Sequence, residues 1–318
     1  MRIFLVSLAW LVGFMLLGGL AMAGFTHTLF PHLHAPGVGI KLIGLGVECG
    51  INLFVLGMCF GLLPGARRRP GAAQPFGLAQ GIWGMAGFGV VMAGGGALLA
   101  NVVSIEDFAL LARHAAARVD FTGRAFLLAL VMAGETAAAL WVVWYLRRLG
   151  VARVEDGGET GIGWRAAPGP AYVAATAMAV GIVGIVMLLF YAMPPDTQAL
   201  QDLPDAKLFD GGGLAMLPLL AVIIFIGPAL EEMVFRGIGF AGLATRLGPA
   251  WAGVITTVIF MAAHAPEKMY YPPGFIDVGL MAAAAVMLRL QYRSIRPAIL
   301  LHVLYNAGSM LAAGVFMQ

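Results

Sequence analysis

Residues 214–236 read LAMLPLLAVIIFIGPALEEMVFR, and this stretch decides the class of protein. Within this stretch, residues 214–230 contain no charged side chain. This uncharged run is nearly as long as the roughly 20 apolar residues that cross a bilayer. It ends in two glutamates and an arginine, Glu231, Glu232 and Arg236. Ionisable groups are costly inside a bilayer and are functional candidates by default. The stretch therefore predicts a membrane helix that carries functional groups near one end.

The whole chain shares this apolar character. Of its 318 residues, 61% are hydrophobic and 11% are charged, and the mean hydropathy is +0.90. A soluble domain carries about 25% charged residues, so a packed globular core does not explain this composition. Apolar runs occur near 4–24, 38–63, 77–103, 124–146, 171–193, 214–236, 250–266, 275–291 and 298–316. The sequence predicts an all-α fold, a polytopic membrane helix bundle of about eight or nine transmembrane helices, since the 275–291 run is short.

Arginines between the apolar runs predict the orientation. One set of alternate loops holds Arg67, Arg68, Arg69, Arg147, Arg148, Arg153, Arg165, Arg246, Arg293 and Arg296. By the positive-inside rule, we expect these loops and the N-terminus in the cytoplasm and a multi-pass protein of the cell (inner) membrane. This topology accounts for the net charge of +3, and no basic face with interleaved aromatics occurs. We therefore expect membrane lipid, and no nucleic acid, around the chain.

The charged motif at 231–236 has a helical geometry of its own. Adjacent residues on a helix point about 100° apart, so Glu231 and Glu232 cannot share a face. Glu232 and Arg236 are four residues apart and are expected to pair, which leaves Glu231 facing elsewhere. The alternative is a helix end whose charges simply reach the cytoplasmic interface.

Two further polar motifs lie on later apolar runs. Phe260 and His264 fall near the end of the 250–266 run, and His302 and Asn306 share one face of the 298–316 run. Each pair has a structural alternative, namely packing for His264 and hydrogen bonding between helices for His302 and Asn306.

The three motifs fall in order on successive parts of the C-terminal region, and together they supply a site that activates water. Such a site needs a base, a partner for the proton and donors for the developing oxyanion. Glu231 and His264 are equally distant from a predicted turn at 247–249, so two helical arms return them to the same depth. Straight helices would hold His264 and His302 apart, and the sequence leaves open whether tilt, a re-entrant segment or an interfacial stretch joins them.

Written as motifs, these residues are Glu231-Glu232-x-x-x-Arg236, Phe260-x-x-x-His264 and His302-x-x-x-Asn306. They resemble the three motifs of the CPBP family, which comprises type II CAAX prenyl endopeptidases, bacteriocin-processing and immunity (Abi-like) proteins, and related membrane proteases. The resemblance covers roughly residues 214–312. It implies an intramembrane protease core at 214–318, preceded at 1–213 by a membrane region of five predicted helices with no assigned role.

The resemblance also implies a role for each matching residue. Glu231 would be the general base that activates water, with His264 assisting, and His302 and Asn306 would line the oxyanion hole. The implied activity is that of a glutamic intramembrane endopeptidase, which hydrolyses a peptide bond. Its expected substrate is a protein or peptide that is lipidated or otherwise associated with the membrane.

Supporting residues and cofactors follow from the same resemblance. Glu232 and Arg236 would hold the first motif helix in register, and Phe260 belongs to the second motif. Such proteins are often labelled metalloproteases, yet the resemblance implies no required metal or other cofactor. The rival is a divalent metal such as Zn, although no His-Glu-x-x-His helix occurs and adjacent glutamates chelate poorly.

A non-catalytic alternative stays open at this point. A membrane transporter, or an immunity or scaffold protein, would use intramembrane Glu and His for proton or ligand binding. Glu48 and Glu135 lie in other apolar runs and would then matter as much as Glu231. In a peptidase they would be dispensable for cleavage.

Overall fold

The structure is a computed structural model of the full chain. It describes residues 76–112, 124–196, 217–269 and 271–316, together with six residues at positions 9, 12, 13, 16, 17 and 20. Within these ranges the regular structure is entirely helical, which agrees with the predicted all-α class. Most of the predicted run near 4–24, all of that near 38–63, and Glu48 lie outside the described residues.

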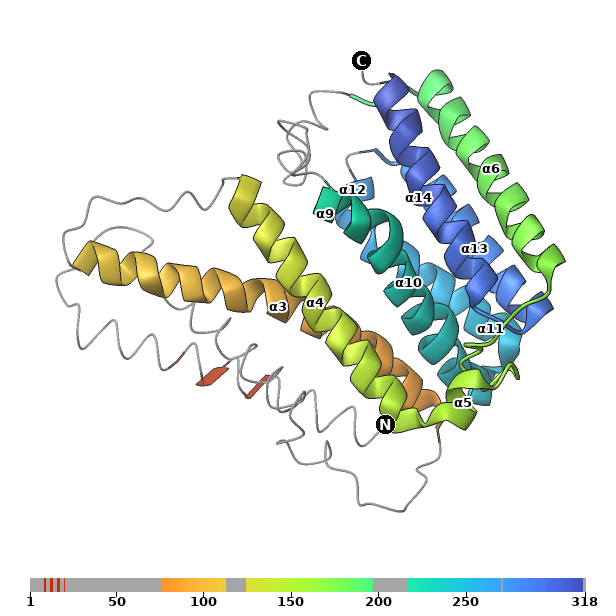
Figure 1. The fold of residues 1–318 in the computed structure, drawn as a ribbon, viewed down its shortest axis with the longest axis horizontal. Helices are drawn as coiled ribbons and strands as arrows, with labels where there is room; N and C mark the ends of the chain where they lie inside the picture. Colours follow the sequence, from red (N-terminus) through yellow and green to blue (C-terminus); the bar gives the residue numbers. More distant parts are fainter. Residues whose placement is uncertain are drawn as a thin grey trace. The chain divides into compact units, whose positions relative to one another are not determined.

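The helices follow the apolar runs along the chain (Figure 1). Their bounds are α3 Leu78–Ala112, α4 Arg124–Leu149, α5 Val151–Glu155, α6 Gly169–Ala192, α9 Leu217–Ala221, η2 Val222–Ile226, α10 Gly227–Glu232, η3 Met233–Gly239, α11 Phe240–Ala263, α12 Ala265–Lys268, α13 Gly274–Tyr292 and α14 Arg296–Phe316, where η marks a π-helical segment. Four stretches in the described part are long and apolar enough to cross a membrane, namely Leu78–Gly96, Ala129–Leu149, Gly169–Ala192 and Gly274–Tyr292.

The remaining predicted runs in the described part are helical but less regular. The run near 214–236 is divided into four short α and π pieces, α9 to η3. Helix α11 breaks at Gly248, where φ is 76° and ψ is 166°, and Pro249 follows. The predicted turn at 247–249 is therefore present as a kink. The 298–316 run corresponds to α14, and the total of eight or nine spans stays a prediction.

The chain divides into two compact units. In the first, the part of α3 after Met85 packs on α4 through small residues. A Cβ atom added at Gly95 would lie 2.7 Å from the Ala133 carbonyl oxygen, and one at Gly87 would lie 2.1 Å from the Trp141 ring. Small residues let membrane helices approach this closely.

The second unit comprises residues 76–85 and 145–318 and contains all three motifs. Helix α14 packs against α6, α13 and α10, and α13 also packs against α11 (Figure 1). Residues three or four apart on one face of α6 are buried in this packing, namely Ala171, Ala175, Ala179 and Ile182. Helix α6, which precedes the charged motif by about 40 residues in the sequence, thus belongs to the same helical bundle as the motifs.

The loop between α5 and α6 is anchored to the turn between α13 and α14. Arg289 is buried in α13, and its guanidinium donates to the carbonyl oxygens of Gly157, Gly158 and Gly161 at 3.3, 2.9 and 2.7 Å. The Ser294 hydroxyl donates to the Arg165 carbonyl oxygen at 2.6 Å. These bonds satisfy backbone carbonyls of an irregular segment that would otherwise need water.

Gly242 of α11 meets Gly81 of α3 backbone to backbone. A Cβ atom added at Gly242 would lie 2.4 Å from the Gly81 Cα and 2.7 Å from its backbone nitrogen. Since backbone cannot move aside as a side chain can, Gly242→Ala should lower the free energy of unfolding by about 1–3 kcal/mol. Unfolding of the purified protein in detergent measures this change.

The matched control is Gly181→Ala in α6, where an added Cβ atom meets nothing within 4 Å. Alanine is favoured over glycine inside helices by roughly 0.5–1 kcal/mol, so this variant should be neutral or slightly stabilised. Equal effects of the two substitutions would contradict the close approach of α3 and α11.

Candidate active site

The charged motif lies between two π-helical segments. Segment η2 ends just before Gly227 and Pro228, and η3 begins directly after Glu232. Pro228 explains the first π-helical segment, η2. Its ring crowds the carbonyl four residues earlier, and proline has no N–H to donate. In the π register, the N–H of residue 228 would bond the Ile223 carbonyl oxygen. That carbonyl therefore needs another donor.

Asn306 of α14 supplies that donor. Its Nδ2 atom donates to the Ile223 carbonyl oxygen at 2.8 Å. A buried carbonyl without a partner is unfavourable, so this bond both satisfies η2 and ties it to α14. Asn306 was expected at the oxyanion hole, and the structure places its amide on the η2 backbone, about two helical turns before Glu231.

The predicted pair of Glu232 and Arg236 is present and buried. Arg236 Nη1 lies 3.0 Å from Glu232 Oε1, and both side chains are 0% exposed. The guanidinium also lies over the Phe260 ring, with 4.5 Å between Cζ and the ring centroid. Arginine can stack on an aromatic face while it bonds a carboxylate, so this pair holds the motif helix against α11.

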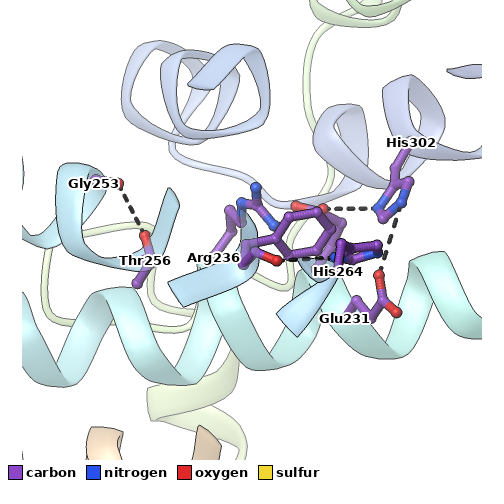
Figure 2. A network of polar contacts seen from close by, with 8 residues as sticks. Glu231, Arg236, Gly253, Thr256, His264 and His302 are labelled. Carbon is purple, nitrogen blue, oxygen red and sulfur yellow. Dashed lines mark hydrogen bonds and ion pairs between the residues drawn. The ribbon is translucent and has the colours of Figure 1, made fainter. Parts of the chain in front are cut away.

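His302 lies between the two glutamates. Its Nδ1 atom is 3.0 Å from Glu232 Oε1, and its Nε2 atom is 3.8 Å from Glu231 Oε2. Figure 2 shows Glu231 and His302 facing one another across this second contact. The Glu231 side chain is 23% exposed, whereas Glu232 is fully buried. Although the two glutamates are neighbours in the sequence, their surroundings differ: Glu231 is partly exposed, while Glu232 is enclosed by Arg236 and His302.

Phe260 brings the two histidines into one site. Its ring centroid lies 4.5 Å from that of His264 and 5.6 Å from that of His302. His264 Nδ1 is 2.9 Å from the Phe260 carbonyl oxygen, so the imidazole folds back along its own helix. This direction is usual for helical side chains, and it explains why the histidines share a neighbour although straight helices would separate them.

The hydrogen bonds fix how each imidazole presents its second nitrogen. A carbonyl oxygen only accepts, so His264 Nδ1 carries the proton that it donates to Phe260. An ionised Glu232 likewise requires that His302 donates from Nδ1. In their neutral forms both rings then have a lone pair at Nε2. For His302 this is the atom that faces Glu231.

Sequence reasoning missed a second polar pair beside the site. The Tyr305 hydroxyl donates to Asp277 Oδ2 at 2.6 Å, in a buried position between α14 and α13. The Tyr305 and His302 ring centroids are 6.3 Å apart. Asp277 and Arg289 are ionisable residues inside the apolar run at 275–291, and that property is the signal that could have identified them.

A metal centre needs several ligand side chains around one point. Within the ranges that the structure describes, no group of three or more His, Cys, Asp or Glu side chains is placed to hold a metal ion. Glu232 already bonds Arg236 and His302 through one oxygen, Oε1. A catalytic zinc takes three protein ligands, and Glu232 Oε1 already serves two other contacts.

In the described part of the chain, four stretches long and apolar enough to cross a membrane, and a buried cluster of glutamate, histidine and arginine in the second unit, indicate a membrane protein with a polar site among its helices. The comparison with protein families then makes this class specific. Residues 213–308 match the model described as "Type II CAAX prenyl endopeptidase Rce1-like". This part of the chain, which contains every motif residue of the site, is a domain of the CPBP family, as its motifs predicted. No curated protein and no solved structure matches the chain.

The family match implies peptidase activity in general terms and a membrane location. It does not assign the substrate or the role of any single residue. Those assignments rest on the geometry of the site.

Proposed function

We propose that residues 213–308 form an intramembrane endopeptidase in which Glu231 activates the attacking water. The observation that carries the proposal is the difference between the two glutamates. Glu231 is partly exposed and faces His302 Nε2 at 3.8 Å, whereas Glu232 is buried between Arg236 and His302. Only an accessible carboxylate can take a proton from a water molecule, so Glu231 fits the general base.

The proposed reaction proceeds without an acyl-enzyme. The oxygen of the water attacks the carbonyl carbon of the scissile bond while Glu231 accepts one of its protons. The resulting tetrahedral oxyanion needs donors, for which we propose the second amide N–H of Asn306 and His302, which can donate from Nε2 in its doubly protonated form, with His264 assisting. Collapse breaks the C–N bond, and the proton held by Glu231 passes to the leaving nitrogen.

Glu232 has a positioning role in this scheme. It accepts from His302 Nδ1 at 3.0 Å and so directs Nε2 toward Glu231. A carboxylate that holds an imidazole by one nitrogen and aims the other at the reacting group is a recurrent catalytic arrangement. Arg236 holds the Glu232 carboxylate in place by their contact at 3.0 Å, which supports the predicted role of this pair.

The proposed substrate is a protein or peptide held in the membrane, lipidated or with its own anchor. The family match suggests a peptide or prenylated protein, and the site lies on helices packed between candidate spans. We propose the cell (inner) membrane as the location, with the N-terminus in the cytoplasm as the arginine distribution predicts.

The proposed mechanism requires no metal. Cleavage by the purified protein should therefore persist in the presence of EDTA and of 1,10-phenanthroline, because Glu231 activates water without Lewis-acid help. The rate of product formation with and without chelator measures this. Loss of activity that added Zn²⁺ restores would contradict the proposal and favour a metallopeptidase.

Protein termini in cells test the function and identify the substrate. Membrane and secreted proteins are compared between cells carrying the wild type and cells carrying Glu231→Gln at equal abundance. Uncleaved termini that accumulate with Glu231→Gln, and not with Glu135→Gln, would support a peptidase. Unchanged termini under conditions where the protein is required would overturn it, and equal effects of both variants would favour a proton path.

A further inference from the structure

A cavity of about 230 Å³ lies beside the proposed active site, between the last turns of α6, the start of α13 and the middle of α14. Its wall is largely apolar and includes Leu189, Phe190, Met310 and Ala313. Whole small-molecule ligands occupy pockets of about 300–1,000 Å³. This cavity is smaller, so it suits one large side chain or a short tail.

Two polar atoms in the cavity wall lack a partner. Asp277 and Ser309 line the cavity, and Asp277 Oδ1 and Ser309 Oγ are buried with no hydrogen-bond partner among the described residues. The other oxygen of Asp277 accepts from Tyr305 at 2.6 Å, so the carboxylate is fixed in direction. A buried acceptor without a donor is unfavourable, which points to a group that arrives from outside.

The outer wall of the cavity is tied to α6. The Tyr271 hydroxyl donates to the Met193 carbonyl oxygen at 2.8 Å, and the Tyr271 and Phe190 ring centroids are 5.5 Å apart. Burial, and then the charge of Asp277, raise the pKa of the Tyr271 phenol above its ordinary value. The phenol therefore stays protonated and keeps its hydrogen bond to the Met193 carbonyl oxygen. This side of the cavity is thus preformed in the absence of a ligand.

The cavity continues the catalytic face of α14. His302, Tyr305, Ser309 and Ala313 recur at helical spacing, and the last three line the cavity. From position 302 to position 309 the helix rises by about 10 Å. An extended peptide covers that distance with about three residues.

We propose that this cavity is a substrate subsite that accepts a side chain with an apolar body and a hydrogen-bond-donating tip. The side chain lies about three residues from the scissile bond, and its tip donates to Asp277 Oδ1. The inference rests on the proposed peptidase function and extends it to the choice of substrate. A subsite with a fixed acceptor discriminates strongly against side chains that leave the acceptor unpaired.

Matched peptides test the subsite on the full-length protein in liposomes. The peptides are synthetic and span the cleavage site that the comparison of protein termini identifies. Each carries tryptophan or 2-naphthylalanine at one position, two to four residues from the scissile bond on either side. The two side chains are close in size, and only tryptophan donates. At one position the wild type should cleave the tryptophan peptide on the order of tenfold faster.

Asp277→Asn should abolish this preference. The carbonyl oxygen of the asparagine still accepts the hydrogen bond from Tyr305, so its NH₂ group points toward the cavity. There it faces the indole N–H, and two donors cannot form a hydrogen bond. The ratio of the two rates should then fall to about one or below. Ala313→Leu, which fills the cavity, should slow both peptides at that position. Ala177→Leu, on the exposed face of α6, should leave rates and ratio unchanged.

The outcomes separate the two proposals. Cleavage that depends on Glu231 but shows no tryptophan preference at any position, or the same preference with Asp277→Asn, would overturn the subsite alone. Cleavage that does not depend on Glu231 would overturn the peptidase proposal. If Ala313→Leu displaces a co-purified lipid and leaves peptide rates unchanged, the cavity holds lipid, and the subsite is wrong.

Discussion

Glu231→Gln should lower the rate of peptide cleavage by about 10²–10⁴-fold, the range associated with loss of a general base. Glutamine keeps the size of the side chain and removes its ability to accept a proton. The side chain is 23% exposed, so the substitution leaves no deeply buried charge unpaired. Folding should be unaffected, and the loss should appear in kcat with little change in KM.

Two controls make this result specific. Glu135→Gln changes a glutamate in α4, within a candidate membrane span, and should cleave at the wild-type rate. Glu231→Asp keeps the carboxylate but draws it away from His302 Nε2, so it should retain part of the activity. Wild-type cleavage by Glu231→Gln at matched abundance would show that another group activates the water.

Arg236→Met should lower the free energy of unfolding by about 3–5 kcal/mol, because it removes one partner of a buried ion pair. Glu232 and Arg236 are both 0% exposed, so water cannot replace the lost partner. Methionine also gives up the cationic contact over Phe260. Unfolding in detergent measures the change, with Arg246→Met on the exposed surface of α11 as the matched control.

The double variant Glu232→Gln with Arg236→Met should recover much of this loss, since no unpaired charge is left buried. Its activity should stay low, because a neutral glutamine holds the His302 imidazole less firmly than a carboxylate does. A double variant less stable than Arg236→Met alone would contradict the idea that the unpaired carboxylate of Glu232 causes the loss.

Local geometry explains what the sequence predicts well. The four-residue spacing of Glu232 and Arg236 predicts their pairing, and the structure contains it. Gly248 and Pro249 predict a break, and the backbone at Gly248 is non-helical. These features depend on neighbours within one or two helical turns, which is why a single sequence is enough to predict them.

Contacts between helices were harder to predict. The spacing of Glu231 and His264 predicted only a common depth, and no spacing rule indicated that His302 of α14 would face Glu231 at 3.8 Å. Helical periodicity fixes depth along a helix only if the helix is straight, and η2 and η3 change the register on both sides of Glu231. The proline at position 228 was the available signal for the first of these changes.

The bond from Asn306 to Ile223 was also outside the reach of the sequence. It joins residues 83 positions apart, and it depends on a carbonyl freed by a proline five residues later. Asp277 was accessible in principle, as an acid inside an apolar run, but its partner Tyr305 lies on another helix. Rules on spacing within a helix cannot pair residues across a bundle.

In the proposed reaction this chain itself adds water across a peptide bond by means of Glu231. The most direct test incubates the purified protein in liposomes with a peptide spanning the cleavage site and weighs the products by mass spectrometry. The wild type should give two fragments whose masses sum to that of the peptide plus one water, and Glu231→Gln should give none. The same fragments at the same rate from both proteins, or none from the wild type, would contradict the claim.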